Sequence, residues 1–251
     1  MRNLTGPVLL TAGLLMAGCA GSAERPTAAG SALPRVATKG ATLDLSVLRG
    51  SGGGDYTPLD SPEALAKVAP IVAAGVVDGF QPGPTFESHK GGPPNYNVVL
   101  RVKVTQPIKG VKERLGTSIP AGVIHILLSQ GGAYRDDSTS VVGWRPRRTI
   151  EEFRKALPAG ISVLAFAWER HDLHELPLMD AGTQLREGTA LLRVHPQGFI
   201  LEDPGLAANR APDESALVSG AERLTFGGGE WIRSKTLAEM VERLKRNGFG
   251  E

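Results

Sequence analysis

Alternation of apolar and polar residues dominates the middle of the chain. It is clearest over residues 96–105, where every second side chain is apolar and most of the others are polar. A period of two places the apolar side chains on one face, which predicts a strand with one buried and one solvated side. Apolar runs predict further strands at residues 71–77, 123–129 and 161–168. Gly75 interrupts the first of these runs and predicts a bulge there.

Two more strand regions flank this central part. Residues 42–48 alternate and predict a first strand. Residues 189–195 and 199–202 are apolar-rich runs separated by Pro196-Gln197-Gly198. Because proline and glycine favour tight turns, this segment predicts a β-hairpin.

Helices are few and short. A capping serine followed by proline and glutamate predicts a helix over residues 62–68, and a capping box predicts one over residues 150–157. A helix over residues 235–247, capped by Ser234, has one apolar stripe that we expect to pack on the sheet. The stripe consists of Leu237, Met240, Val241 and Leu244. Residues 203–230 lack a clear period and predict irregular structure.

Composition agrees with a mainly β (α+β) domain. The chain has 32 glycines and 18 prolines, which suit many turns between short elements, and 41% hydrophobic residues, which suffice for a core. We expect one globular domain over residues 41–251. A formal net charge of +2 over 251 residues disfavours a nucleic acid partner. The single cysteine rules out a disulfide within the chain.

The N-terminus predicts export. Arg2 is followed by an apolar run from Val8 to Ala17 that contains no acidic residue. This run is too short to cross a bilayer permanently, which takes about 20 residues. A charged start, a short apolar stretch and small residues are typical of a signal peptide, here residues 1–18. Ordinary cleavage after Ala23 and an uncleaved anchor remain as alternatives.

The segment Leu15-Met16-Ala17-Gly18-Cys19 resembles the lipobox of bacterial lipoproteins, although Met16 departs from the usual Leu, Val or Ile. The resemblance implies a lipid anchor on Cys19, with acyl chains such as palmitate, and cleavage before this residue. It also implies an exported protein held at a cell membrane. Residues 19–40 are rich in Ala, Gly, Ser, Pro and Thr and predict a flexible tether. Ala20 carries no clear sorting signal, so the choice between membranes stays open.

The order of the central motifs supports a second resemblance. It rests on five segments: IVAAGVV, YNVVLRVKVTQPIKG, VIHILLSQGG, ISVLAFAW and LLRVHPQGFIL. Over residues 62–202 this order resembles uncharacterised exported bacterial domains with an OB-like or TIMP/netrin-like barrel. The resemblance implies a small OB-like antiparallel β-barrel or curled sheet, with short helices and the C-terminal amphipathic helix. Residues 111–121 and 133–148 exceed a minimal barrel.

Familiar catalytic motifs are missing from the sequence. It contains no G-x-S-x-G, S-x-x-K or H-E-x-x-H pattern. Residues 229–236 approach a phosphate-binding loop, but Ser234 stands where glycine is required. We therefore assign no catalytic residue from the sequence.

The densest group of metal-ligand types lies in the segment ERHDLHE. Its candidate ligands are Glu169, His171, Asp172 and His174, and imidazole nitrogens and carboxylate oxygens suit zinc and related metals. The alternative is an ordinary charged loop at the end of a strand. No other cofactor is predicted. His125, inside an apolar strand, either faces a pocket or is a hydrogen-bonded sheet residue.

A second candidate surface is the segment Trp144-Arg145-Pro146-Arg147-Arg148. Tryptophan and arginine are enriched at binding hot spots, and arginines attract anionic lipid headgroups. Trp144, Arg145, Arg147 and Arg148 are thus candidates for contact with a membrane, an acidic glycan or an envelope protein. In the alternative, Asp136, Glu151 and Glu152 neutralise the arginines while Trp144 packs over the core.

Three functional hypotheses follow. The first is a membrane-anchored envelope lipoprotein that acts as a non-enzymatic binding module. The second is a lipoprotein that binds a metal or small ligand through residues 169–175. The third is a hydrolase whose site has no familiar motif.

Overall fold

The computed structural model describes residues 42–49, 56–137 and 143–251. These residues belong to one compact unit. The predicted signal peptide, Cys19 and the predicted tether lie outside the described residues.

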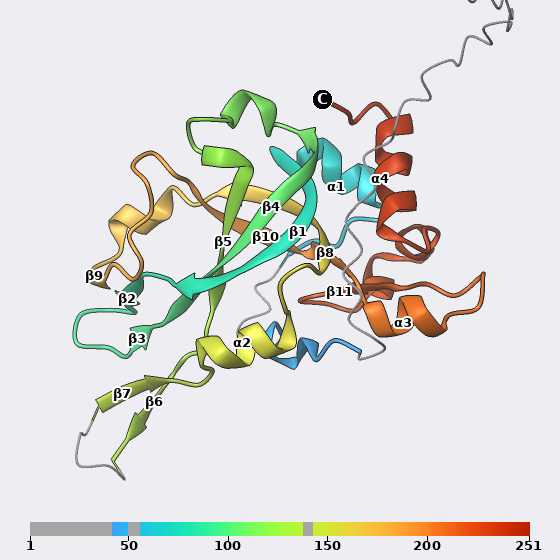
Figure 1. Cartoon of the computed structure of the whole chain (residues 1–251). Helices are drawn as coiled ribbons and strands as arrows, with labels where there is room; N and C mark the ends of the chain where they lie inside the picture. The colour runs from blue at the N-terminus through green and yellow to red at the C-terminus, as the bar shows by residue number, and fades with distance from the viewer. Residues whose placement is uncertain (1–41, 50–55, 138–142) are drawn as a thin grey trace, which may run out of the picture. The chain divides into compact units, whose positions relative to one another are not determined.

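The centre of the structure is a closed five-stranded barrel (Figure 1). The strand order is β10-β5-β4-β1-β8, and β10 pairs again with β8 to close the ring. All neighbours are antiparallel except β5 and β10, which run parallel. The expected OB-like barrel is therefore confirmed. Its strands are β1 (Ile71–Pro82), β4 (Asn97–Lys109), β5 (Val123–Ser129), β8 (Ser162–Glu169) and β10 (Leu191–Glu202).

The barrel interior is apolar because alternate residues of each strand point inward. Val98, Leu100 and Val102 of β4 meet Ile124 and Ile126 of β5 inside the barrel, and all are at most 1% exposed. This is the alternation that predicted the strands.

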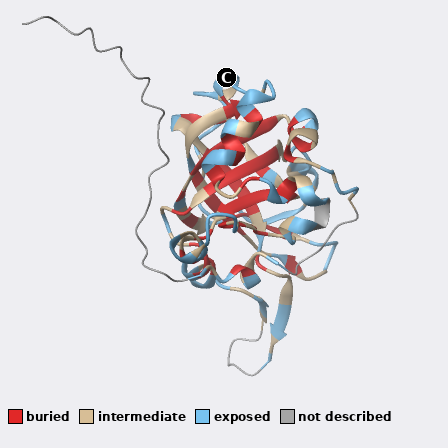
Figure 2. Cartoon of the chain, turned by 90° about the vertical axis from the view of Figure 1, so that its right-hand side faces the viewer, coloured by how far each residue is buried: buried red, intermediate tan, exposed pale blue. Residues whose placement is uncertain are grey.

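A second core lies between the outer wall of the barrel and two helices. Helix α1 (Pro62–Val68) and helix α4 (Leu237–Arg246) cover the outward side chains of β1, β8 and β10. Trp231 is buried there, with its ring 6.3 Å from that of Phe166. Arg243 of α4 donates to Glu63 of α1 (Nη2 to Oε2, 2.8 Å), which fixes one helix against the other. Figure 2 shows the buried strands behind this helical layer.

Helix α2 (Ile150–Ala156) packs against one part of the barrel core. The predicted capping box is confirmed, since Thr149 and Glu152 bond reciprocally. Phe153 of α2 and Leu157 after it belong to the barrel core. The 3₁₀ helix η1 (Leu45–Val47) contacts α2, so the beginning of the described chain lies beside this helix (Figure 1).

The remaining elements are short and connect the barrel strands. The small strands are β2 (Thr85–Glu87), β3 (Pro94–Asn95), β6 (Ala133–Asp136), β7 (Gly143–Pro146), β9 (Leu178–Asp180) and β11 (Leu217–Ser219). The other helices are η2 (Lys112–Arg114), η3 (Pro120–Gly122), η4 (Asp172–Glu175), α3 (Pro204–Asn209), η5 (Leu224–Gly227) and η6 (Gly229–Ile232). Strands β3, β2 and β9 form a separate sheet, and β6 pairs with β7.

The hairpin predicted over residues 189–202 is wrong. Residues Leu191–Glu202 form the continuous strand β10, in which residues 195–198 stand opposite the single residue Phe166 of β8. The Pro-Gln-Gly segment therefore lies in a bulge of β10 rather than in a turn. The buried Gln197 side chain holds this bulge by bonding to both the N–H and the carbonyl of Leu59.

Three further expectations need correction. Residues 42–48 contain η1 rather than a strand, because Asp44 caps a single helical turn. Helix α4 begins after Thr236, whose hydroxyl accepts from the Glu239 N–H, so Ser234 is not its cap. Residues 203–230 include α3 and β11, and Asp203 caps α3 through the N–H groups of Gly205 and Leu206.

The bulge predicted at Gly75 is confirmed by a register shift between β1 and β4 at this residue. A side chain at Gly75 would overlap the carbonyl oxygen of Lys103. We expect Gly75→Ala to lower the free energy of unfolding by about 2 to 3 kcal/mol, because backbone must move to make room. Urea denaturation measures this change. Gly143→Ala, where the new methyl group meets open space, is the control and should stay within about 0.5 kcal/mol of the parent. Equal losses in the free energy of unfolding for the two substitutions would contradict the close approach of Lys103 to Gly75.

Candidate functional site

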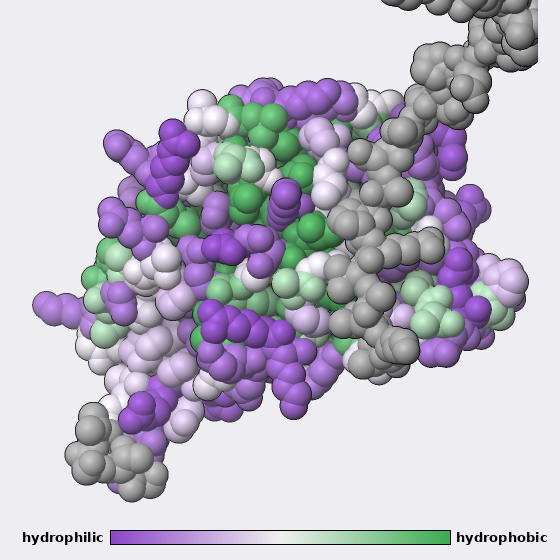
Figure 3. All heavy atoms as spheres, viewed as in Figure 1, coloured by the Kyte–Doolittle hydropathy of each residue, from purple (hydrophilic) through white to green (hydrophobic). Residues whose placement is uncertain are grey.

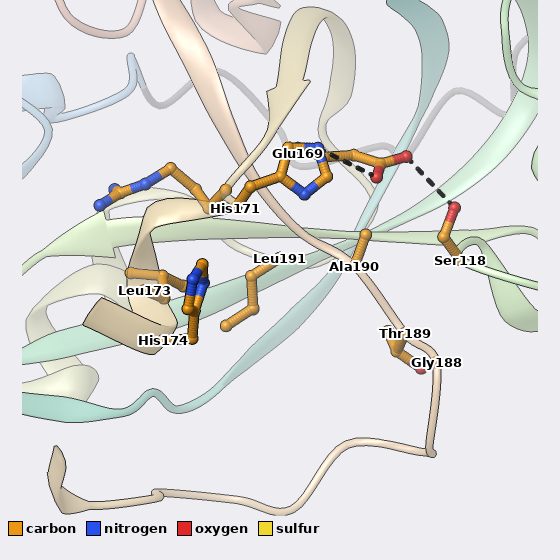
Figure 4. Close-up of a pocket in the computed structure, with 10 residues that line it drawn as sticks. Ser118, Glu169, His171, Leu173, His174, Gly188, Thr189, Ala190 and Leu191 are labelled. Atoms are coloured by element: carbon orange, nitrogen blue, oxygen red, sulfur yellow. Dashed lines mark hydrogen bonds and ion pairs between the residues drawn. The ribbon is translucent and has the colours of Figure 1, made fainter. Parts of the chain in front are cut away.

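A pocket of about 450 Å³ lies where β8 ends and β10 begins. We call it the rim pocket; Figure 4 shows its lining residues. Glu169 ends β8, His171 and His174 come from or adjoin η4, and Ser118 comes from the loop between η2 and η3. The pocket therefore collects side chains from two connections that are far apart in the sequence.

Glu169 is the central polar group of the rim pocket. Its Oε1 accepts from Arg114 Nε at 2.9 Å and from Ser118 Oγ at 3.3 Å. Its Oε2 lies 3.7 Å from His171 Nε2 (Figure 4). The carboxylate thus lies between the serine and the histidine. A serine nucleophile needs the histidine next to its hydroxyl, with the acid behind it, so these three residues do not form that kind of triad.

The four predicted metal ligands are only partly brought together. Asp172 accepts two hydrogen bonds from Arg170, at 2.7 and 2.8 Å, which lower the pKa of its carboxyl to about 2. His174 lines the pocket, and its Nε2 is 3.9 Å from Glu175. Across the described residues, no group of three or more ligand side chains is arranged to hold a metal. Glu169 and His171 remain as one pair, and their 3.7 Å separation compares with about 3.4 Å between two ligands of a tetrahedral zinc.

Thr189 adds an unusual feature to the rim pocket. Its hydroxyl is buried and has no hydrogen-bond partner within the described part of the chain. A buried hydroxyl without a partner is destabilising by about 1 to 3 kcal/mol, so a ligand or water molecule with a matching polar group would be favoured beside it.

His125 lies on the outward side of β5 and is nonetheless buried. Its neighbour across the strands, Arg101, pairs with Asp78 at 2.6 Å. His125 Nδ1 has no partner among the described residues. Burial, and then the positive charge of Arg101, lower the pKa of this histidine.

The second candidate site is the hairpin of β6 and β7, which we call the arm. Both ribbon views show it extending away from the barrel (Figures 1 and 2). Tyr134 stands opposite Arg145, and Arg135 stands opposite Trp144. Since side chains alternate along a strand, each face of the arm carries one aromatic residue and one arginine. Tyr134 is 44% exposed and Trp144 is 42% exposed.

The alternative interpretation of this segment holds only in part. Asp136 pairs with Arg145 at 3.3 Å, but Glu151 pairs with Arg154. Trp144 is exposed rather than packed over the core. In the space-filling view the arm extends at the lower left, and hydrophilic residues prevail on its visible surface (Figure 3).

Arg148 has a different role from the other residues of its segment. Its guanidinium donates to the carbonyl of Val47 at 2.5 Å and to that of Arg49 at 2.7 Å. Gln130, a buried residue, donates to the Arg148 carbonyl at 2.6 Å. Arg148 therefore joins the base of the arm to the beginning of the described chain. The structure separates it from Trp144, Arg145 and Arg147, which are exposed.

Sequence reasoning missed Tyr134 and Arg135. The available signal was the pair of short segments AYRD and GWRP, each with an aromatic residue next to an arginine. It was too short to predict a hairpin, because register depends on the partner strand.

The fold and these two sites define a mainly β, OB-like barrel protein with a rim pocket and an aromatic, arginine-bearing arm. No protein-family model, no curated protein and no solved structure matches the chain. Among the described residues, no helix has the length and apolar character to cross a bilayer.

We expect the free energy of unfolding to depend on pH because of two histidines. Burial lowers the pKa of His195, which lies between Tyr56 and Trp168, and that of His125. In the unfolded chain both take up protons near pH 6.5, whereas in the folded chain they do so only at lower pH. The unfolded state then binds more protons, so the free energy of unfolding falls as pH falls below about 6.5.

Urea denaturation between pH 7.5 and 5 measures this effect. The variant His125→Gln with His195→Gln should lose part of the decline between these pH values. If the free energy of unfolding declined as much in the variant as in the parent, the assignment of this pH dependence to His125 and His195 would be wrong.

Proposed function

We propose that this protein is an exported envelope lipoprotein that works as a non-enzymatic binding module through its arm. The observation that carries the proposal is the arm itself, with exposed Trp144 and Tyr134 beside arginines. Large aromatic side chains are usually buried in the core, and exposed tryptophan, tyrosine and arginine are typical of binding surfaces.

The N-terminal motif supports the location. Leu15 to Cys19 resembles a lipobox, and the following 22 residues, 19–40, have the composition of a flexible tether. Two or more acyl chains hold a protein stably on a bilayer, whereas one chain holds it only marginally. The partner in this proposal is the membrane itself, an envelope protein or an envelope glycan.

The rim pocket supports a binding role rather than a reaction. Its carboxylate is already engaged by Arg114 and Ser118, and the order of serine, glutamate and histidine does not activate the hydroxyl. No residue of the pocket is assigned a catalytic role.

A second candidate function is binding of a metal ion or small ligand in the rim pocket. It is favoured by the Glu169–His171 pair and by the buried Thr189 hydroxyl. This candidate keeps two of the four ligands predicted from the sequence, with His174 at the pocket wall.

Native mass spectrometry tests the second candidate on the chain from Ala20 onward, purified after export without chelator. Metal binding predicts a mass excess equal to the ion, lost in His171→Ala and retained in His89→Ala, which changes an exposed histidine in another connection. A bare polypeptide mass in the parent chain would remove this candidate.

The proposed anchor is tested by Cys19→Ala. Without the thiol no diacylglycerol can be attached, so we expect the protein to leave the membrane fraction. Cell fractionation followed by immunoblotting measures the change, and Ser22→Ala is the control that keeps the cysteine. Mass spectrometry of the parent protein tests the modification itself, and absence of an acyl mass on Cys19 would refute the anchor.

A further inference from the structure

The segment from Gly131 to Arg148 carries a net positive charge. Arg135 and Arg145 of the arm are matched by Asp137 and Asp136, so the excess comes from Arg147 and Arg148 at its base. From Gly131 to Arg148 the described residues include four arginines and two aspartates, a formal charge of +2. The whole chain of 251 residues carries the same formal charge of +2. The rest of the chain is therefore neutral on balance, although it contains other basic segments such as residues 101–114. The base of the arm is one place to which an anionic surface would be attracted.

The two ion pairs of the arm differ in exposure. Arg135 pairs with Asp137 at 2.9 Å, and both side chains are more than 60% exposed. Arg145 pairs with Asp136 at the longer distance of 3.3 Å. The exposed Arg135–Asp137 pair contributes little to stability, so the Arg135 guanidinium can exchange its carboxylate for a phosphate group. The Asp136 side chain is only 16% exposed, but that of Arg145 is 47% exposed and can meet a phosphate on its open side.

The aromatic residues suit a membrane–water boundary. Tryptophan and tyrosine combine an apolar ring with a polar group, and they favour sites where one side is apolar and the other is wet. On the arm each of them shares a face with an arginine opposite to it. Both faces thus offer the same combination of ring and cation.

The base of the arm lies close to the start of the described chain. Arg148 bonds to Val47 and Arg49, and η1 contacts α2 directly after the arm. The predicted tether ends at residue 40, two residues before the described chain begins. A flexible tether of 22 residues has a root-mean-square length of about 25 Å, so a chain anchored at Cys19 keeps this end near the bilayer.

The base also fixes the direction of the arm. Tyr96 donates from its hydroxyl to the Trp144 carbonyl at 2.8 Å, and the Arg148 N–H donates to the Gln130 carbonyl at 3.0 Å. Gly131 and Gly132 both have φ of 86°, which glycine adopts without strain, so the chain can leave β5 sharply at this point.

We propose that the arm docks on the anionic lipid headgroups of the membrane to which Cys19 is anchored. Trp144 and Tyr134 lie at the level of the headgroups, and Arg135, Arg145 and Arg147 bind their phosphates. This inference rests on the proposed lipid anchor for its biological setting. The arm supplies a second, electrostatic attachment that orients the barrel on the bilayer.

The test uses residues 31–251, which form one compact unit and lack the anchor. Co-sedimentation compares vesicles rich in phosphatidylglycerol with vesicles of phosphatidylcholine alone. We expect binding only to the anionic vesicles, weakened by salt. The triple variant Arg135→Gln, Arg145→Gln, Arg147→Gln should bind at least about tenfold more weakly. The matched control Lys112→Gln, Arg233→Gln, Arg246→Gln removes equal charge from other exposed positions and should keep binding close to that of the parent.

Tryptophan fluorescence tests whether the arm enters the bilayer. The chain has three tryptophans, and Trp231 is buried. Anionic vesicles should shift the emission to shorter wavelength, and Trp144→Phe should abolish this shift while the protein keeps its far-ultraviolet circular dichroism. Absence of binding to anionic vesicles, or equal losses in the two triple variants, would overturn the proposal. Binding to an acidic polysaccharide without binding to vesicles would also overturn it and identify a glycan surface.

The lipid anchor and membrane binding by the arm are tested in separate experiments, so one can be refuted without the other. Release of Cys19→Ala from membranes is measured in cells on the whole protein, whereas vesicle binding is measured without the anchor. If vesicle binding is lost while Cys19→Ala is released, the anchor stands and the arm has another role. If the arm binds vesicles, it can also hold Cys19→Ala at the membrane, so the anchor is then judged by mass spectrometry of the parent protein, and absence of an acyl mass on Cys19 refutes it.

Discussion

Closure of the barrel depends on β10, which pairs with β8 along its length and with β5 at its first residues. On its other edge β10 pairs with β5 only at Leu191 and Leu192 and with β11 at residues 200–202, so the strand bends away from β5 between these two parts. The bulge at residues 195–198 provides the bend, and Gln197 satisfies its own amide group against the backbone of Leu59. The barrel core and the helical layer both rest on this strand, since Phe199 points into the first and Ile200 into the second.

Once the barrel is closed, its connections become the sites. The connection between β8 and β10 returns to the end of the barrel and meets the loop before η3, which creates the rim pocket around Glu169. The connection between β5 and α2 instead leaves the barrel as the arm and returns through Arg148. The rim pocket is thus a hollow in which the Glu169 carboxylate is already bonded, and the arm is a projecting surface with exposed aromatic rings and arginines. A role in binding follows more directly from the second.

The proposed orientation on a membrane joins these features physically. The Arg148 hydrogen bonds join the base of the arm to Val47 and Arg49, near the start of the described chain, so in this proposal an anchored domain would present that end to the lipid surface. A lipid anchor alone would leave the barrel free to turn. A second contact of moderate strength would limit that rotation and leave the opposite parts of the barrel open to other envelope components.

Elements with local signals could be predicted from the amino-acid sequence. Alternation over residues 96–105 predicted β4 and the Thr149–Glu152 capping box predicted α2, because each depends on neighbouring residues alone. Gly75 marked the place of a bulge, but the close approach to Lys103 comes from the pairing of β1 with β4. Tertiary structure decided the rest. Pro196-Gln197-Gly198 looks like a turn locally, yet pairing with β8 on both sides makes it a bulge within one strand. Asp172 looks like a metal ligand, yet Arg170, two residues before it, holds its carboxylate through a local contact. Glu169 and His171 meet beside Ser118, about 50 residues away in the chain, and only the fold brings these groups together. The arm needed both of its short strands to find their register, and no local pattern encodes the partner across a long connection.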